Sequence, residues 1–405
     1  MIRLVKISLL VCAAILLVRP AFSQGRIGIP YQMHRLSNGL TVILHEDHTV
    51  PMVAVDVWYH VGSGYEKKGR TGFAHLFEHI MFEGSGNVAE GDFDNLLEQV
   101  GGSNNGSTTT DRTNYYETLP SNALDIALFL ESDRMGYLLE AMSPGKVDGQ
   151  RDVVKNERRQ SYENRPYGMA FQTIVENLFP ENHPYNWPTI GYMDDLTAAS
   201  YDDVVEFFKK YYVPNNAVLV VAGDIDPSET LKRVKYWFDE IPAGPPVLKP
   251  VAPNFMLEAP KYLQMEDNVQ LPRLYLVYPT PAYYAPGDAE LDVAANVLAG
   301  GKTSRLYKKL VYDLGIAQSV SAYQSSQALG SMFMIVVTAR PGHTLEEIGA
   351  IVDAEVAILA QEPPSERELE RVINQREASF LSESQSLLGK AEALQNYFYY
   401  TGNPD

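Results

Sequence analysis

The hydrophobic and polar positions of this chain follow two different periods. Short runs rich in β-branched and aromatic residues predict strands, and longer segments with apolar residues three or four positions apart predict helices. In the first half the pattern predicts strands at residues 40–44, 53–61, 107–119 and 217–222, and helices at residues 72–82, 92–100, 121–140, 147–163 and 201–212. The two kinds of element are mixed without the regular alternation of βαβ units, which favours an α+β fold.

The second half of the chain repeats this order after a proline-rich segment. Six prolines lie between residues 242 and 260, so this stretch is interpreted as a semi-rigid linker. Beyond it the pattern predicts strands at residues 274–278, 319–323 and 332–338, and helices at residues 290–298, 304–312 and from residues 345 and 366 onward. The repeated order indicates a degenerate duplication, although two unrelated α+β domains would give a similar order.

We therefore expect an α+β protein with two homologous-looking domains, each an antiparallel-rich sheet packed by helices. The first domain is expected at residues 24–243, the linker at 244–257 and the second domain at 258–405.

Residues 1–23 have the composition of an export signal. Arg3 and Lys6 are positive, residues 9–18 are an unbroken apolar run, and small residues stand at the cleavage-determining positions 21 and 23. The expected location is periplasmic or secreted, with no stable membrane insertion after cleavage and a membrane anchor if the signal is uncleaved. Cys12, the only cysteine, lies inside this segment. Any metal site of the mature chain must therefore use histidine and carboxylate ligands.

The charge of the chain limits its partners. With 51 acidic and 33 basic residues, the formal net charge is −18. Nucleic acid and anionic membrane surfaces are disfavoured as partners, because phosphate binding requires clustered lysine and arginine. A mild preference for a basic or neutral partner is one interpretation, and an acidic surface that only keeps the protein soluble is the other.

His75-Leu76-Phe77-Glu78-His79 is the segment with the clearest chemistry. On a helix, two histidines four residues apart share a face and can bind one metal ion. Glu78 lies near the same face but is poorly placed for ligation beside both imidazoles, so the role of general base toward a metal-activated water suits it best. The alternative is an amphipathic helix whose histidines are ordinary core or surface residues.

The motif and its surroundings resemble the inverted zinc motif of the pitrilysin and mitochondrial processing peptidase family, the inverzincins. Gly72-Phe73-Ala74 precedes the motif and Met81-Phe82-Glu83-Gly84-Ser85 follows it. Other family segments recur in order at residues 101–108 (GGSNNGST), 151–159 (RDVVKNERR), 183–185 (HPY) with 191–192 (GY), and 300–301 (GG) with 304–306 (SRL). The resemblance extends from about residue 31 to the final residue.

The resemblance implies a zinc endopeptidase with one Zn²⁺ per chain. The family's third ligand is a glutamate on a later helix, and the matching residue is Glu157; the other ligands are His75 and His79. Asn105 matches a residue beside the bound peptide, although it can also be a simple turn former after Gly101-Gly102. The resemblance further implies that an extended or unfolded peptide pairs with an edge strand in a chamber between the halves. It also implies that the first domain, which contains the motif, is the zinc-binding peptidase domain.

Two departures from the family pattern bear on activity. A supporting glutamate is often found seven residues before the third ligand, whereas this chain has Gln150, which can form hydrogen bonds but carries no charge. Active members commonly have an arginine and a tyrosine seven residues apart in the second domain, and the matching residues are Val311 and Gln318. We therefore expect this chain to be the zinc-bearing subunit of a heterodimer with a homologous zinc-less subunit that supplies the Arg and Tyr.

Two further expectations follow from the resemblance. The alternative function is a non-catalytic core or scaffold subunit, or a peptide-binding subunit of the same fold, although such relatives tend to lose zinc ligands. The family's second domain continues past residue 405, so the second domain is expected to be truncated at its C-terminus, with apolar surface uncovered around residues 394–400.

Overall fold

The computed structural model describes residues 28–253 and 255–405, and it contains two β-sheets. The larger sheet has six strands in the order β1-β2-β6-β3-β5-β4: β1 (Gln32–Arg35), β2 (Thr41–Glu46), β3 (Met52–Tyr59), β4 (Ser103–Thr108), β5 (Thr113–Pro120) and β6 (Ala217–Gly223). The smaller sheet has three strands in the order β7-β9-β8: β7 (Arg273–Thr280), β8 (Ala317–Ser325) and β9 (Ser331–Ala339). Among the strands of the described residues only β2 and β6 pair in parallel, so the expectation of antiparallel-rich sheets is confirmed.

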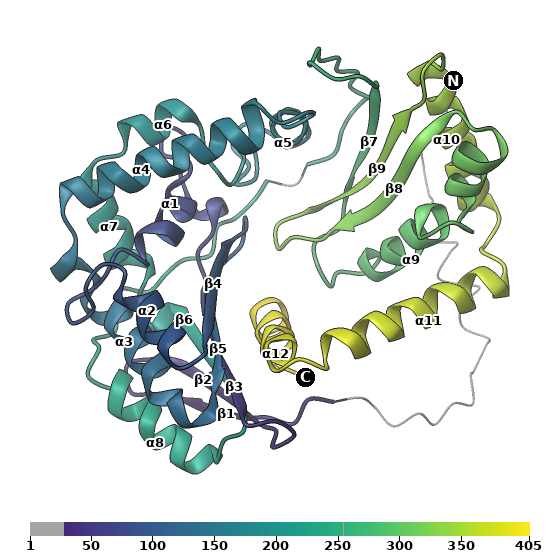
Figure 1. The fold of residues 1–405 in the computed structure, drawn as a ribbon. Coiled ribbons are helices and arrows are strands. Elements are labelled where there is room, and N and C mark those ends of the chain that lie inside the picture. The colour runs from purple at the N-terminus through teal and green to yellow at the C-terminus, as the bar shows by residue number, and fades with distance from the viewer. Residues whose placement is uncertain (1–27, 254) are drawn as a thin grey trace.

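The described residues of the first half form eight helices, most of which lie on one face of the larger sheet (Figure 1). They are α1 (Phe73–Ile80), α2 (Asp92–Gln99), α3 (Leu124–Ala141), α4 (Pro144–Arg158), α5 (Ala170–Leu178), α6 (Met193–Ala198), α7 (Tyr201–Tyr211) and α8 (Pro227–Phe238). Several begin where the sequence supplies a cap: the side chains of Ser143, Ser200 and Asp226 accept hydrogen bonds from the first turns of α4, α7 and α8. The main apolar core lies between these helices and the sheet.

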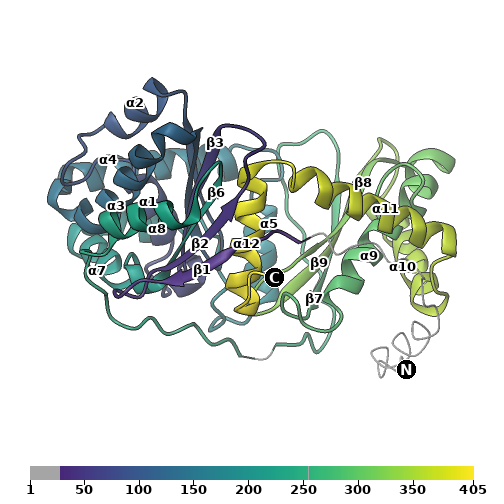
Figure 2. The ribbon, with the colours of Figure 1, turned by 90° about the horizontal axis from the view of Figure 1, so that it is seen from below.

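The second half adds α9 (Asp288–Ala299), α10 (Leu345–Gln361), α11 (Glu366–Glu383) and α12 (Leu387–Thr401). The last of these leaves the smaller sheet and crosses to the opposite face of the larger one, as Figures 1 and 2 both show. Ala391 and Leu394 pack there against apolar residues of β2 and β6. The Gln395 amide donates to the main-chain oxygens of Asp56 and Val218, both at 2.9 Å.

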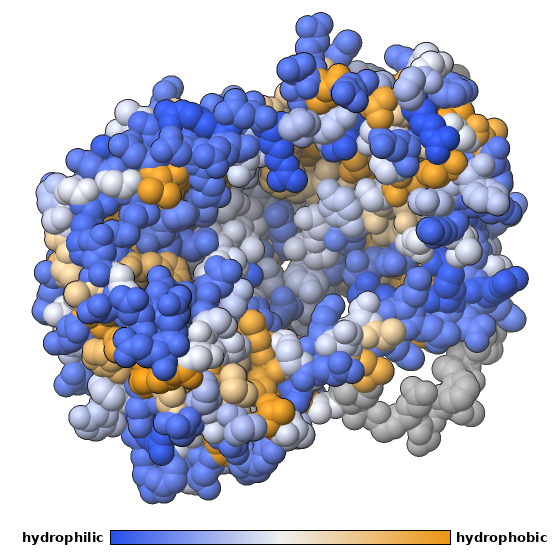
Figure 3. All heavy atoms as spheres, in the orientation of Figure 1, coloured by the Kyte–Doolittle hydropathy of each residue, from blue (hydrophilic) through white to orange (hydrophobic). Residues whose placement is uncertain are grey.

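The position of α12 corrects the expectation of uncovered apolar surface around residues 394–400. Leu394 is 1% exposed and Tyr399 is 7% exposed, because the free face of the larger sheet provides their apolar partner. The two halves face each other across a recess, which Figure 3 shows as a hollow in the surface. The edge strand β4 borders that recess on one side, and the smaller sheet lies on the other (Figure 1).

Several predicted elements need correction. Residues 107–119 do not form one strand: they belong to the β4–β5 hairpin, whose turn is closed by the Thr109 amide donating to the Arg112 oxygen at 2.8 Å. The helix predicted at 304–312 is a π-helical turn at Tyr307–Asp313, and α4 likewise continues as a π-helical turn at Arg159–Glu163. Helices α5, α6, α8 and α12 were not predicted. Among them α6 has only six residues, which leaves little periodic signal.

Between α8 and β7 the chain runs without a helix or strand from residue 242 to 253 and from 255 to 272. The proposed export signal at residues 1–23 lies outside the described residues. Over residues 28–253 and 255–405, no helix has both the length and the apolar composition that crossing a bilayer requires.

A buried ionic cluster joins α3 to the larger sheet. The guanidinium of Arg134, 1% exposed, donates to Glu131 and also to Glu117 on β5 at 3.3 Å, and both carboxylates are fully buried. Three aromatic rings, those of Phe82, Phe93 and Tyr115, surround the same guanidinium. Two buried carboxylates are therefore compensated by one cation.

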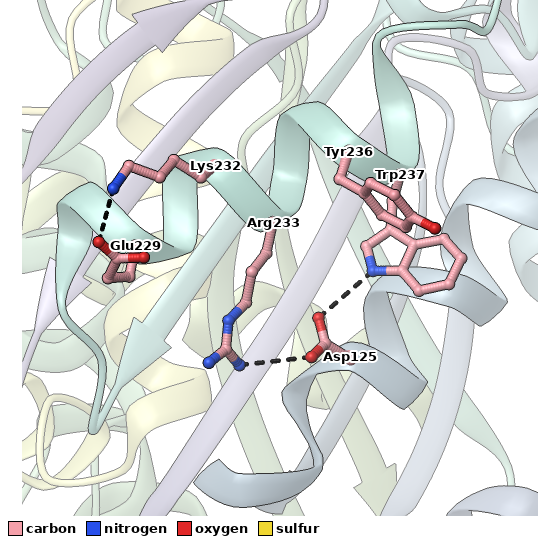
Figure 4. A pocket seen from close by; sticks show the side chains of 6 residues that line it. All are labelled: Asp125, Glu229, Lys232, Arg233, Tyr236 and Trp237. Atoms are coloured by element: carbon pink, nitrogen blue, oxygen red, sulfur yellow. Dashed lines mark hydrogen bonds and ion pairs between the residues drawn. The ribbon is translucent and has the colours of Figure 1, made fainter.

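Replacing Arg134 with methionine is expected to lower the free energy of unfolding by about 3–5 kcal/mol, because two buried carboxylates lose their cation. The matched control is Arg233→Met on α8: Arg233 lies 3.5 Å from Asp125 in a shallow, solvent-exposed depression between α8 and α3 (Figure 4). An exposed ion pair contributes less than about 1 kcal/mol. Urea unfolding measures both, and equal losses in the two variants would contradict the role of Arg134.

Candidate metal centre

Helices α1 and α4 bring His75, His79 and Glu157 together. Glu157 Oε2 lies 3.6 Å from His75 Nε2 and 3.3 Å from His79 Nε2, and one ligand atom from each residue lies within 4.8 Å of the others. Ligand atoms bound to a tetrahedral zinc at about 2.0–2.1 Å stand roughly 3.3–3.4 Å apart. The two distances from Glu157 are close to this spacing, and the three donors have the chemistry of a candidate three-ligand zinc site.

The environments of His75 and Glu157 favour the protonation states that bind a metal. Burial lowers the pKa of His75, which keeps the imidazole neutral. The pKa of Glu157 is lowered, mainly by its hydrogen bond with His79, which keeps the carboxylate ionised. The side chains of His75, His79 and Glu157 are 12%, 26% and 39% exposed, so the cluster is open to solvent on one side.

Glu78 lies on α1 between the two histidines, on the side that faces the edge strand β4. A Cβ atom at Gly106 on β4 would stand 3.3 Å from the Glu78 Cγ atom, so the carboxylate side chain lies directly against this strand. Glu78 is partly exposed. The base candidate and the open edge of the sheet therefore border the same space.

Asn105 lies one residue before Gly106 on β4 and is exposed. It pairs with Tyr116 of β5, and its Oδ1 accepts a hydrogen bond from the Gly106 amide at 2.8 Å. Asn105 does not join the ligand cluster, and its place on the outermost strand is compatible with a contact to a peptide. Its role stays a prediction.

Gln150 does not contact the three candidate ligands. Its Nε2 donates to Glu83 Oε1 at 2.6 Å, just beyond the end of α1. Burial raises the pKa of Glu83, and the neutral amide of Gln150 holds this carboxylate in place. In this chain Gln150 therefore links α4 to the end of the motif helix.

The two positions where the family has Arg and Tyr carry no such side chains here. Val311 lies in the π-helical turn and packs against the second apolar core. Gln318 is an exposed residue on β8, where a register irregularity separates Ala317 from Ser319.

The structure identifies one positioning residue that the sequence alone did not reveal. The buried carboxylate of Glu66 accepts hydrogen bonds from the Gly72 amide at 3.0 Å and from the Ala74 amide at 2.8 Å. It thereby satisfies two free amides at the N-terminus of α1, the helix of the two histidines. Position 72 requires glycine, because its φ is +87° and an added Cβ atom would lie 3.1 Å from the Gly191 Cα atom. The nearest sequence signal is an acidic residue shortly before Gly72, which is too common to single out.

Glu66 is expected to make stability depend on pH. Burial raises its pKa from 4.5 to about 8. Between these values the unfolded chain has lost the proton and the folded chain retains it, so the free energy of unfolding falls as the pH rises from about 5 to 8. The variant Glu66→Gln is expected to show a flatter profile, measured by urea unfolding at pH 5.5, 7 and 8. Equal slopes for the two proteins would contradict this assignment.

Comparisons with known proteins identify related peptidases. A model described as "Insulinase (Peptidase family M16)" matches residues 41–187, and one described as "Peptidase M16 inactive domain" matches residues 198–376. The zinc protease PqqE of Helicobacter pylori is 28% identical over 369 residues, which are 89% of this chain and 82% of PqqE.

Two solved structures have the same fold. The crystal structure of a protease from Helicobacter pylori gives a TM-score of 0.84 at 27% identity and covers 92% of this chain and 90% of that one. The periplasmic protease PqqL from Escherichia coli gives 0.73 at 21% identity and covers 91% of this chain but 42% of PqqL. The resemblance inferred from the motifs is confirmed: this chain belongs to the M16 (insulinase) family of peptidases, and several of its relatives there are named zinc proteases.

Proposed function

We propose that this protein is a zinc-dependent endopeptidase that hydrolyses extended or unfolded peptides. The observation that carries the proposal is the convergence of His75, His79 and Glu157, with Glu78 beside the edge strand β4. One Zn²⁺ per chain is the proposed cofactor. Membership of the M16 family supports the reaction class.

Different residues of the chain bind the metal, transfer the proton and position the motif helix. His75, His79 and Glu157 would hold the metal, which, when bound, supplies Lewis-acid activation of a water molecule and of the peptide carbonyl. Glu78 accepts the proton of the attacking water and returns it to the leaving amine. Glu66 and Gln150 fix the two ends of the motif helix, which keeps Glu78 and the histidines in register.

The substrate class follows from the shape of the recess. Strand β4 is the last strand of its sheet, so its outer edge can pair with one extended peptide segment. This edge borders the hollow between the halves that Figure 3 shows, and a folded protein does not present an isolated strand there. Asn105 is the proposed contact to the peptide backbone.

We further propose that the active form contains a second, homologous subunit without zinc ligands. Val311 and Gln318 cannot supply the positive charge and the phenol that the family uses opposite the metal. PqqL, of which this chain covers 42%, shows that the fold also occurs within a much longer chain. The apolar run before residue 23 supports a periplasmic or secreted location for the assembly.

The test is hydrolysis of a set of unstructured peptides by the full chain, alone and with a co-expressed zinc-less homologue. The proposal predicts cleavage that stops on chelation and returns with added zinc, and that rises when the partner is present. Equal rates with and without the partner would contradict the proposed heterodimer but not the proposed zinc-dependent cleavage. Bound zinc without cleavage in either form would instead support a peptide-binding or scaffold subunit.

A further inference from the structure

Asp111 stands at the tip of the β4–β5 hairpin and is 4% exposed. Its Oδ1 accepts a hydrogen bond from the Tyr185 hydroxyl. Its Oδ2 accepts from the Ala328 amide at 3.0 Å and from the Tyr400 hydroxyl at 2.9 Å. Its main-chain oxygen accepts from the Tyr399 hydroxyl at 2.7 Å. One buried carboxylate thus has three donors, and a fourth holds the backbone of the same residue.

These donors come from three separate parts of the chain. Tyr185 lies between α5 and α6 in the first half, Ala328 lies in the turn between β8 and β9, and Tyr399 and Tyr400 lie on α12. The Tyr185 hydroxyl also accepts a hydrogen bond from the Leu329 amide at 3.0 Å, which ties the same turn a second time. Asp111 is therefore the point where the hairpin of the edge strand meets the second half.

The position matters because β4 and the turn between β8 and β9 border the recess from opposite sides. Next to Asp111 is a cavity of about 340 Å³, lined by residues of both halves, among them Arg112, Phe171, Gln327 and Tyr400. Other contacts between the halves are an apolar cluster in which Val175 and Phe179 meet Met332 and Met334, and hydrogen bonds farther along, from Tyr167 to Asp267 and Leu271 and from α12 to the larger sheet. None of these holds the tip of the β4–β5 hairpin. Apolar contacts tolerate sliding, whereas the hydrogen bonds to one carboxylate fix distance and direction.

We infer that Asp111 is a positioning residue that fastens the second half to the tip of the edge-strand hairpin and so sets the width of the recess beside the metal centre. The catalytic consequence rests on the proposed function, but the structural one does not. A carboxylate offers acceptors only, and an amide replaces one acceptor with a donor that would face the donors around it. The variant Asp111→Asn should therefore loosen the joint without touching any candidate ligand.

The matched control is Asp133→Asn. Asp133 is 2% exposed, and its carboxylate likewise has three donors: the Ser85 hydroxyl, the Asn87 amide at 2.9 Å and the Asn87 side-chain amide at 2.6 Å. All these groups belong to the first half. The control therefore changes an equally buried carboxylate with the same number of donors, but it leaves the contacts between the halves unchanged.

The distance between spin labels on the two halves measures directly whether Asp111 holds the halves together. In the full chain with Cys12→Ser, the exposed residues Tyr236 on α8 and Tyr312 in the second half are replaced by cysteine and labelled. We expect one distance population in the parent and in Asp133→Asn. In Asp111→Asn we expect a second, longer population, with the ratio of open to closed molecules raised about tenfold, as the loss of one charge-assisted hydrogen bond predicts.

Activity gives the second readout. For hydrolysis of a long unstructured peptide, Asp111→Asn should raise KM several-fold with a smaller change in kcat, and Asp133→Asn should leave KM near that of the parent. If Asp111→Asn fails to fold, Tyr400→Phe removes a single donor and should raise the open population more modestly. Identical distance distributions in the Asp111 and Asp133 variants would overturn the inference. A parent that cleaves no peptide would refute the proposed function, while the distances would still decide the role of Asp111.

Discussion

Replacing Glu78 with glutamine is expected to lower kcat/KM for peptide hydrolysis by about 10²–10⁴-fold while leaving one zinc ion per chain. The amide has nearly the same shape as the carboxylate but cannot accept the proton of the attacking water. Glu78 is not one of the three converging ligands, so metal content should not change. Peptide kinetics and elemental analysis of the same preparation measure the two quantities together.

The control for this variant is Glu90→Gln. Glu90 is an exposed acid after the motif helix whose ion pair with Lys146 spans 3.7 Å, so its loss should change neither rate nor zinc content by more than a small factor. Full activity in Glu78→Gln would remove Glu78 from the role of base. Loss of zinc in that variant would indicate that the carboxylate helps to bind the metal.

Replacing Glu157 with alanine is expected to weaken zinc binding at least about 100-fold, since even the loss of a partner in the outer shell of a metal site costs 10–100-fold. The change removes one of three donors and the only negative charge within 3.6 Å of both histidine Nε2 atoms among the described residues. Competition with a chromophoric chelator gives the dissociation constant directly.

Asp152→Ala is the matched control, because Asp152 lies on the same helix, is 72% exposed and contacts only Lys155, at 3.7 Å, among the described charged residues. Its zinc affinity should equal that of the parent. Equal affinities for Glu157→Ala and the parent would show that the third ligand lies elsewhere.

The motif helix could be predicted from the sequence because its chemistry is local. His75 and His79 share a face through the helical period alone, and Glu78 follows from the same geometry. Glu157 lies on another helix far along the chain, and only the resemblance to the family pointed to it. Glu66 and Asp111 act through hydrogen bonds to backbone amides and to distant side chains, and no local pattern in the sequence records such contacts.

The fold shows the same division between local and distant order. Most strands and long helices were expected within a few residues, since long segments of helix-forming residues and runs of β-branched residues give the clearest local signal. The crossing of α12 to the larger sheet was missed, because its partners on β2, β3 and β6 are distant in sequence and its own pattern does not say which sheet it covers. The hairpin turn at residues 109–112 was missed because threonine-rich strand chemistry continues through it.

The central claim is that His75, His79 and Glu157 bind one zinc ion. Crystals grown with zinc, with diffraction recorded on both sides of the zinc absorption edge, test it most directly. The account predicts one anomalous peak per chain, within about 2.0–2.2 Å of the two Nε2 atoms and a Glu157 carboxylate oxygen. No peak at that place, or a peak held by other residues while Glu157 points away, would contradict it.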